Sequence, residues 1–226
     1  REWWDEFWRW RFHGIETAGS TDVGPADGRP SAHTPPPGME WEWGNATGDT
    51  DWYGASADLV ESVVRTFVSP AAGPVLQIGC GDSPIPELLH KAGFQVSEHL
   101  DVAPQVIANM KKRYPAADWP GLRFEVRDFL ASGAPPPAHR FAAVIDKAGI
   151  WDWLQEESVE ALPHLLAAVR EALLPGEQQG VYVIATKQSP RQLSESLARA
   201  MSVNAGGVSS SFIVEGTQAL GNKGIA

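Results

Sequence analysis

The sequence predicts an α/β fold built on a doubly wound, mostly parallel sheet. Two observations support this prediction. Strand-like apolar runs alternate with segments of helical periodicity over most of the chain. In addition, the apolar run Val75-Leu76-Gln77-Ile78 ends in Gly79-Cys80-Gly81, a glycine turn typical of a buried strand that leads into a helix beside a nucleotide-type ligand. We therefore expect a sheet that is covered by helices on both faces.

The individual elements follow from periodicity. Apolar residues recur at helical spacing between residues 55 and 68, which predicts a helix before the first strand. The five strands are expected at residues 75–79, 95–100, 122–126, 141–146 and 180–186. The helices between and after them are expected at residues 85–92, 103–113, 157–174 and 190–201. The fourth strand is apolar throughout, which favours a central position in the sheet.

Residues 1–54 and 55–226 differ in composition. The first part is an aromatic-rich N-terminal segment with an insertion at residues 14–50, rich in Gly, Pro, Ser and Thr, for which we expect partial disorder. The second part is expected to form one ligand-binding domain. With 226 residues and 43% hydrophobic content, the chain is long enough for one large core and too short for two.

Composition also excludes several classes of function. The formal net charge of −10 argues against a broad nucleic-acid interface, which needs clustered Lys and Arg. Because Cys80 is the only cysteine, neither a disulfide framework nor a Cys-rich metal site is expected. No apolar segment approaches the length of a membrane span, about 18 to 20 residues. We expect a soluble, cytoplasmic protein, a monomer without a metal.

The glycine turn distinguishes between nucleotide cofactors. Dinucleotide sites place a third glycine where this chain has Pro84, and Asp82 would bring negative charge to the position of a pyrophosphate. Asp101 lies 22 residues after Gly79, at the expected end of the second strand, where a carboxylate can bind ribose hydroxyls. S-adenosylmethionine has a ribose and an adenine but no phosphate, so it fits best. An ordinary strand-to-helix turn is the alternative.

Two further strand ends carry polar residues at the same edge of the sheet. Asp128-Phe129 follows the third strand and could bind adenine, although a solvated acid would look the same. Asp146-Lys147 ends the fourth strand and leads into a loop, residues 148–154, that contains Trp151 and Trp153. Aromatic faces there would attract a sulfonium or a cationic amine, unless they only cover the core. Asp146 could orient the methionine ammonium or pair with Lys147.

These motifs together resemble the successive motifs of class I S-adenosylmethionine-dependent methyltransferases. They are similar in particular to the methyltransferase-like branch that modifies lysines of translation elongation factor 1 alpha. The branch has Asn where this chain has Asp82, and its fourth-strand motif matches Asp146 to Leu154 after one inserted residue. The matching segments are Trp3-Trp4-Asp5-Glu6-Phe7-Trp8, Asp51-Trp52-Tyr53-Gly54, Val75 to Ser83, Asp101-Val102, Asp128-Phe129, Asp146 to Leu154 and Leu174-Pro175-Gly176.

The resemblance implies a Rossmann-like class I methyltransferase fold and S-adenosyl-L-methionine as cofactor. Only one short strand candidate, residues 211–214, remains for the terminal hairpin of that fold, so either the hairpin is shortened or the chain is cut. The residues expected to bind the cofactor are Trp52, Tyr53, Gly79, Cys80, Gly81, Ser83, Asp101, Val102, Asp128, Phe129, Asp146 and Lys147. Asp146 and Asp152 are expected to contact the acceptor, and Trp151 to line the methyl-transfer pocket with Trp52 and Tyr53. The last two could instead hold the first helix on the sheet.

The acceptor is the least determined part of this interpretation. The resemblance implies a protein-lysine N-methyltransferase whose partner is a protein substrate, with a translation elongation factor as one candidate. Ile150 and Trp151 depart from the Thr-Leu of the branch, in the loop that would meet the acceptor. A small-molecule N-, S- or O-methyltransferase and an inactive S-adenosylmethionine-binding scaffold stay open as alternatives.

Overall fold

The computed structural model describes residues 51, 54–131, 138, 140–175 and 180–203. The N-terminal segment with its insertion, Trp52, Tyr53 and the strand candidate at residues 211–214 lie outside the described residues. Within that described part, no helix has the length and the apolar character that crossing a membrane requires.

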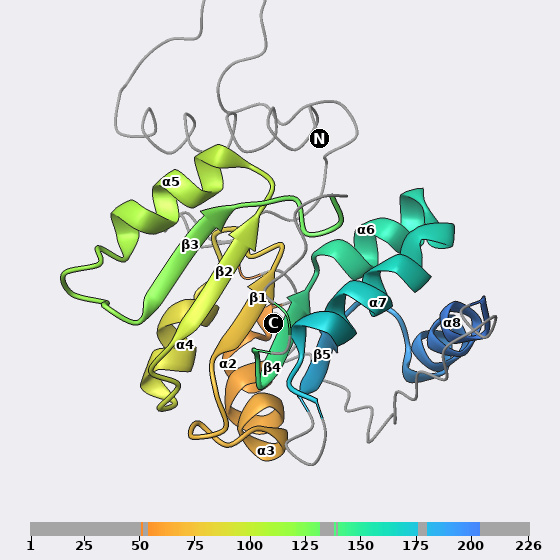
Figure 1. The fold of residues 1–226 in the computed structure, drawn as a ribbon, viewed down its shortest axis with the longest axis horizontal. Coiled ribbons are helices and arrows are strands. Elements are labelled where there is room, and N and C mark those ends of the chain that lie inside the picture. Colours follow the sequence, from red (N-terminus) through yellow and green to blue (C-terminus); the bar gives the residue numbers. More distant parts are fainter. Residues whose placement is uncertain (1–50, 52–53, 132–137, 139, 176–179, 204–226) are drawn as a thin grey trace, which may run out of the picture.

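Five strands form a single, entirely parallel sheet in the order β3-β2-β1-β4-β5 (Figure 1). The strands are β1 (Val75–Ile78), β2 (Ser97–Asp101), β3 (Leu122–Val126), β4 (Ala143–Lys147) and β5 (Val181–Ala185). The predicted fold class is therefore confirmed, and the apolar fourth strand does lie inside the sheet. The strand order reverses between β1 and β4, which places the topological switch point beside the glycine turn.

One face of the sheet is covered by the first helices that the structure describes. The predicted helix at residues 55–68 is observed as three consecutive pieces, with a π-helical middle. These pieces and the next helix share a core with β1, β4 and β5, whereas the helix after β2 packs on β3. The elements are α2 (Ser56–Asp58), η2 (Leu59–Val64), α3 (Arg65–Phe67), α4 (Ile85–Lys91) and α5 (Pro104–Arg113).

The helices on the other face differ from the prediction. They are α6 (Ile150–Glu157), η3 (Val159–Ala161), α7 (Leu162–Ala172) and α8 (Pro190–Val203). The expected loop at residues 148–154 is wrong, because most of it forms α6. The helix expected at residues 157–174 is observed as η3 and α7, with a later start: the backbone leaves helical geometry at Ser158, and Pro163 favours a new start because it suits a first helical turn.

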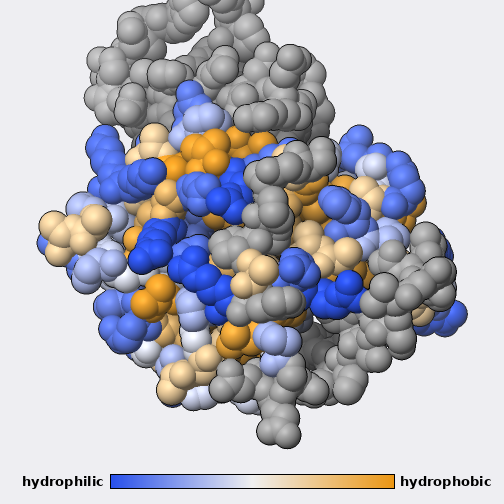
Figure 2. Space-filling view, in the orientation of Figure 1, coloured by the Kyte–Doolittle hydropathy of each residue, from blue (hydrophilic) through white to orange (hydrophobic). Residues whose placement is uncertain are grey.

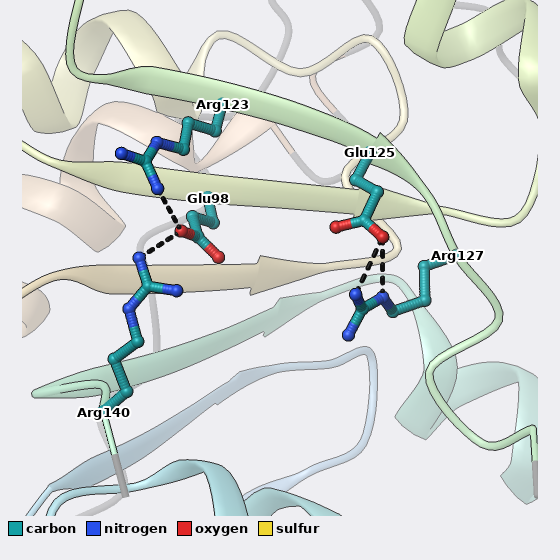
Figure 3. A network of polar contacts seen from close by, with 5 residues as sticks. All are labelled: Glu98, Arg123, Glu125, Arg127 and Arg140. Carbon is teal, nitrogen blue, oxygen red and sulfur yellow. Dashed lines mark hydrogen bonds and ion pairs between the residues drawn. The ribbon is translucent and has the colours of Figure 1, made fainter. Parts of the chain in front are cut away.

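The described helices cover both faces of the sheet unequally. The described residues contain no helix between β3 and β4, and none of the described helices covers β2 and β3 on the side of α6 and α7. Hydrophilic side chains lie there instead (Figure 2). Glu98 Oε1 accepts hydrogen bonds from Arg123 at 3.3 Å and Arg140 at 2.5 Å, and Glu125 pairs with Arg127 (Figure 3). Ion pairs thus replace apolar packing on this half of the face.

Candidate functional site

The glycine turn after β1 is fastened to the end of β2 by Asp101. Gly79 and Gly81 have φ of 60° and 53°, the left-handed region that favours glycine. The Gly81 amide donates to Asp101 Oδ2 and the Ala103 amide to Asp101 Oδ1, both at 2.9 Å. One carboxylate therefore fixes both the turn after β1 and the start of α5. The prediction that Asp101 lies at the end of the second strand is confirmed.

Burial changes the ionisation of two groups in this turn. It raises the pKa of the Asp101 carboxyl, while the amides of Ala103 and Gly81 act in the opposite direction. Burial also raises the pKa of the Cys80 thiol well above its ordinary value, and the nearby Asp101 and Asp82 raise it further. Cys80 therefore remains a neutral thiol that packs against α5 and β3. Val102 is half-buried between Asp101 and Ala103.

A chain of hydrogen bonds connects Ser83 to buried polar side chains of the sheet, which were not identified from the sequence. Gln77 Nε2 donates to Ser83 Oγ at 3.1 Å, and Gln77 Oε1 lies 2.8 Å from His99 Nδ1. His99 Nε2 lies 2.8 Å from Ser97 Oγ. Burial lowers the pKa of His99 to about 3, so the ring is neutral. The available signal was the presence of Gln77 in the otherwise apolar first strand and of His99 two residues before Asp101.

The turn after β4 packs closely on the turn after β1. A Cβ added to Gly149 would lie 2.7 Å from Asp146 Oδ1 and 3.1 Å from the carbonyl oxygen of Ile78. A Cβ on Gly79 would lie 3.2 Å from the Cα of Gly149. Ala148, which directly precedes Gly149, has a φ of 50°, a conformation that is unfavourable for a residue with a side chain. Only glycine at positions 79 and 149 permits this approach.

Asp146 lies beneath this pair of turns with 0% of its surface exposed. Its Oδ2 accepts hydrogen bonds from the Trp151 amide at 2.8 Å and the Tyr182 hydroxyl at 3.0 Å. Its Oδ1 is buried next to Gly149, whose backbone amide also acts on the carboxylate. Burial raises the pKa of Asp146 to about 7, against the hydrogen bonds from Trp151 and Tyr182, and the charge of Asp152 adds to the increase. The carboxyl therefore titrates near neutral pH.

Lys147 binds a carboxylate that is far away in the sequence. Its ammonium lies 2.8 Å from Asp51 Oδ1, and its side chain is only 2% exposed. Burial lowers the pKa of Lys147, and the hydrogen bond and charge of Asp51 oppose the shift. Asp51 Oδ1 also accepts from the Ser56 hydroxyl at 2.6 Å. Lys147 thus connects the end of β4 to the segment that leads into α2.

The other predicted site residues differ in accessibility. Trp151 is 1% exposed, packs in the core, and donates from its indole to Gln188 Oε1 at 3.0 Å. Asp152 is 8% exposed and accepts from the Thr186 hydroxyl. Phe129 is also a core residue, whereas Asp128 is exposed and accepts from the Leu130 amide at 3.0 Å. Thr186 and Gln188 were not identified from the sequence.

The structure brings most of the predicted residues to one edge of the sheet. Asp101 ends β2, Lys147 ends β4, and the turns at Gly79 and Gly149 lie between them. No group of three or more His, Cys, Asp or Glu side chains in the described ranges could hold a metal ion. The edge therefore presents backbone, carboxylates and glycine turns, the groups with which a nucleoside can form hydrogen bonds.

Comparison with known proteins finds similar methyltransferases. No family model matches the chain. It is 28% identical over 157 residues to EEF1A lysine methyltransferase 4 of Mus musculus, covering 64% of this chain and 56% of the relative. It is 30% identical over 129 residues to the eEF1A lysine and N-terminal methyltransferase of Bos taurus, covering 56% of this chain and 18% of the relative. The resemblance inferred from the motifs is thereby confirmed.

These matches span only part of each relative, just over half of the first and less than a fifth of the second. Among solved structures, the geranyl diphosphate C-methyltransferase of Streptomyces coelicolor is 17% identical with a TM-score of 0.49, covering 67% of this chain and 59% of that one.

We predict that replacing Asp146 by Asn changes how stability depends on pH. Below about pH 4 the carboxyl is protonated in both the folded and the unfolded chain. Between about pH 4 and pH 7 the unfolded chain releases a proton that the folded chain keeps, so the free energy of unfolding falls as pH rises. The amide introduced by Asp146→Asn does not ionise and keeps an acceptor for Trp151 and Tyr182.

Urea unfolding across this range should show wild type losing on the order of 3 kcal/mol relative to Asp146→Asn, with a constant difference above about pH 7. A difference that does not vary with pH would contradict the raised pKa of Asp146.

Proposed function

We propose that the chain is an S-adenosylmethionine-dependent methyltransferase that acts on lysine side chains of a protein. The observation that carries this proposal is the carboxylate of Asp101 at the end of β2, hydrogen-bonded to the glycine turn at the switch point of the sheet. A carboxylate in this position can accept hydrogen bonds from ribose hydroxyls. The similarity to two lysine methyltransferases supports the same assignment.

The charges around the glycine turn favour a nucleoside without phosphates. Asp82 and Asp101 are close enough to raise the pKa of the Cys80 thiol between them. A pyrophosphate placed on this turn would be repelled by both carboxylates, whereas a sulfonium would be attracted. The two carboxylates beside the glycine turn thus fit S-adenosylmethionine better than a dinucleotide.

The remaining cofactor contacts are assigned by position. Gly79 and Gly81 are assigned to the methionine and ribose side, and half-buried Val102 lies next to the ribose-binding carboxylate. Asp128 is exposed at the end of β3, where its carboxylate can accept from the adenine amine. Trp52 and Tyr53 are assigned to the methyl-transfer pocket by their place in the sequence, directly after Asp51, whose carboxylate pairs with Lys147.

Methyl transfer places few demands on side-chain chemistry. S-adenosylmethionine supplies a methyl group that an amine nitrogen displaces in line, forming an N–C bond as the C–S bond breaks. The protein therefore acts mainly by positioning the two reactants and excluding water. A lysine acceptor must lose its proton before it attacks, and a neighbouring carboxylate can first bind the cation.

We assign the acceptor contact to Asp152. Its carboxylate is 8% exposed and is oriented by the Thr186 hydroxyl at the end of β5. Asp146 is fully buried, so it acts by holding the turn at Gly149 and the start of α6. Trp151 packs in the core and anchors α6, the helix that carries Asp152. The net charge of −10 also suits an acceptor presented on a basic protein segment.

We predict that Asp101→Ala weakens S-adenosylmethionine binding by at least tenfold in isothermal titration calorimetry, about 1.4 kcal/mol or more for a lost charged hydrogen-bond acceptor. Asp118→Ala, which removes an exposed carboxylate beyond α5, should bind as wild type does. Because Asp101 also fixes the glycine turn, thermal melting of each variant establishes that it is folded. Unchanged affinity in folded Asp101→Ala would refute the ribose assignment.

We also predict that the chain transfers isotopically labelled methyl groups from S-adenosylmethionine to protein in a cell lysate. Acid hydrolysis of the labelled band should yield methylated lysine, because a lysine nitrogen is the proposed acceptor. Asp152→Asn should lower the rate at least tenfold with little effect on cofactor affinity. Label found only in small molecules would indicate a small-molecule methyltransferase, and cofactor binding without any product would indicate an inactive binding protein.

A further inference from the structure

The carboxylate of Asp146 is buried with only neutral hydrogen-bond partners identified. The Trp151 amide and the Tyr182 hydroxyl both donate to Oδ2, and the backbone amide of Gly149 also acts on the carboxylate. The neighbouring cation, Lys147, instead binds Asp51. A buried carboxylate is ordinarily paired with a positive charge, so its negative charge here is poorly compensated.

The glycine turns at the edge of the sheet where the cofactor is assigned lie directly against this charge. Gly79 and Gly149 are both partly exposed, and neither has a side chain. The Cβ position of Gly149 lies 2.7 Å from Asp146 Oδ1, 3.1 Å from the carbonyl oxygen of Ile78 and 3.4 Å from that of Gly79. Three oxygens thus converge beneath the turn, and their combined potential is negative.

The groups that face Asp146 do not cancel this potential. Tyr182 from β5 donates a neutral hydroxyl, and α6 contributes the amide of Trp151 and the carboxylate of Asp152, which adds negative charge. The residues that α7 contributes to the adjoining core, among them Leu162, Leu165 and Leu166, are uncharged. A cation bound over the glycine pair would therefore be stabilised more than a neutral group of the same shape.

We propose that Asp146 determines specificity between the methyl donor and the demethylated product. This inference rests on the proposed function. S-adenosylmethionine carries a sulfonium charge, whereas S-adenosylhomocysteine has a neutral thioether at the same position and is otherwise alike. Ionised Asp146 lowers the free energy of the bound donor more than that of the bound product, which limits product inhibition. Tyr182 is a positioning residue, because its hydroxyl keeps the carboxylate ionised and oriented.

Ionisation of Asp146 makes this preference depend on pH. At about pH 5.5 the carboxyl is mostly protonated in the free protein and discriminates little, whereas at about pH 8.5 it is mostly ionised. The ratio of the two dissociation constants should therefore shift toward the donor by severalfold to about tenfold over this interval. The effect is measured as the ratio of the two dissociation constants. A general loss of folding or binding weakens both ligands alike and leaves this ratio unchanged.

The test is calorimetric titration of S-adenosylmethionine and S-adenosylhomocysteine at both pH values. In Asp146→Asn the ratio should be independent of pH, apart from the titration of the ligands' own amino groups, which this variant measures directly. In Tyr182→Phe the lost hydrogen bond raises the pKa of Asp146 further, so the shift toward the donor should move to higher pH. Tyr114→Phe, which alters a buried tyrosine packed on Phe124 on the other face, should behave as wild type.

A wild-type ratio that does not change with pH, or the same change in Asp146→Asn as in wild type, would overturn this inference and leave the proposed function intact. Failure of folded wild type to bind either ligand would overturn the proposed function itself. If Asp146→Asn does not fold, the comparison of Tyr182→Phe with Tyr114→Phe decides the matter alone: identical pH profiles would count against the proposal.

Discussion

The two hydrogen bonds that Asp101 accepts are the interaction on which the candidate site depends. They join the turn after β1 to the residues that begin α5, so the ends of two neighbouring strands move as one unit. Gly81 can present its amide in this way because it adopts a left-handed conformation. The carboxylate is thereby fixed at the edge of the sheet before any ligand arrives, which reduces the entropy lost on binding.

Much of the fold could be predicted because its signals are local. Apolar runs identified the five strands to within about two residues, and the glycine turn with Asp101 identified the switch point. The failures involve contacts between distant residues. The start of α6 is fixed by the hydrogen bond from the Trp151 amide to Asp146, and Lys147 binds a carboxylate 96 residues away. Spacing along the sequence reveals neither contact.

A second constraint is the close packing of Gly79 on Gly149. It brings the turn after β4 against the turn after β1 and leaves Asp146 buried, with no cation bound to it among the described residues. Such a group lowers the stability of the folded chain near neutral pH, so its presence favours a role in ligand selection in addition to holding the turn at Gly149. The glycine pair and Asp146 therefore account both for the lower stability of the folded chain near neutral pH and for the proposed preference for the methyl donor.

The central claim is that the edge of the sheet at Asp101 binds the ribose of S-adenosylmethionine. A crystal structure of the chain with S-adenosylhomocysteine tests it most directly. The account predicts a ribose hydroxyl about 2.6 to 3.0 Å from a carboxylate oxygen of Asp101, with Asp146 beneath the glycine pair and out of contact with the ligand. A nucleoside bound elsewhere, or a ribose that does not reach Asp101, would contradict it.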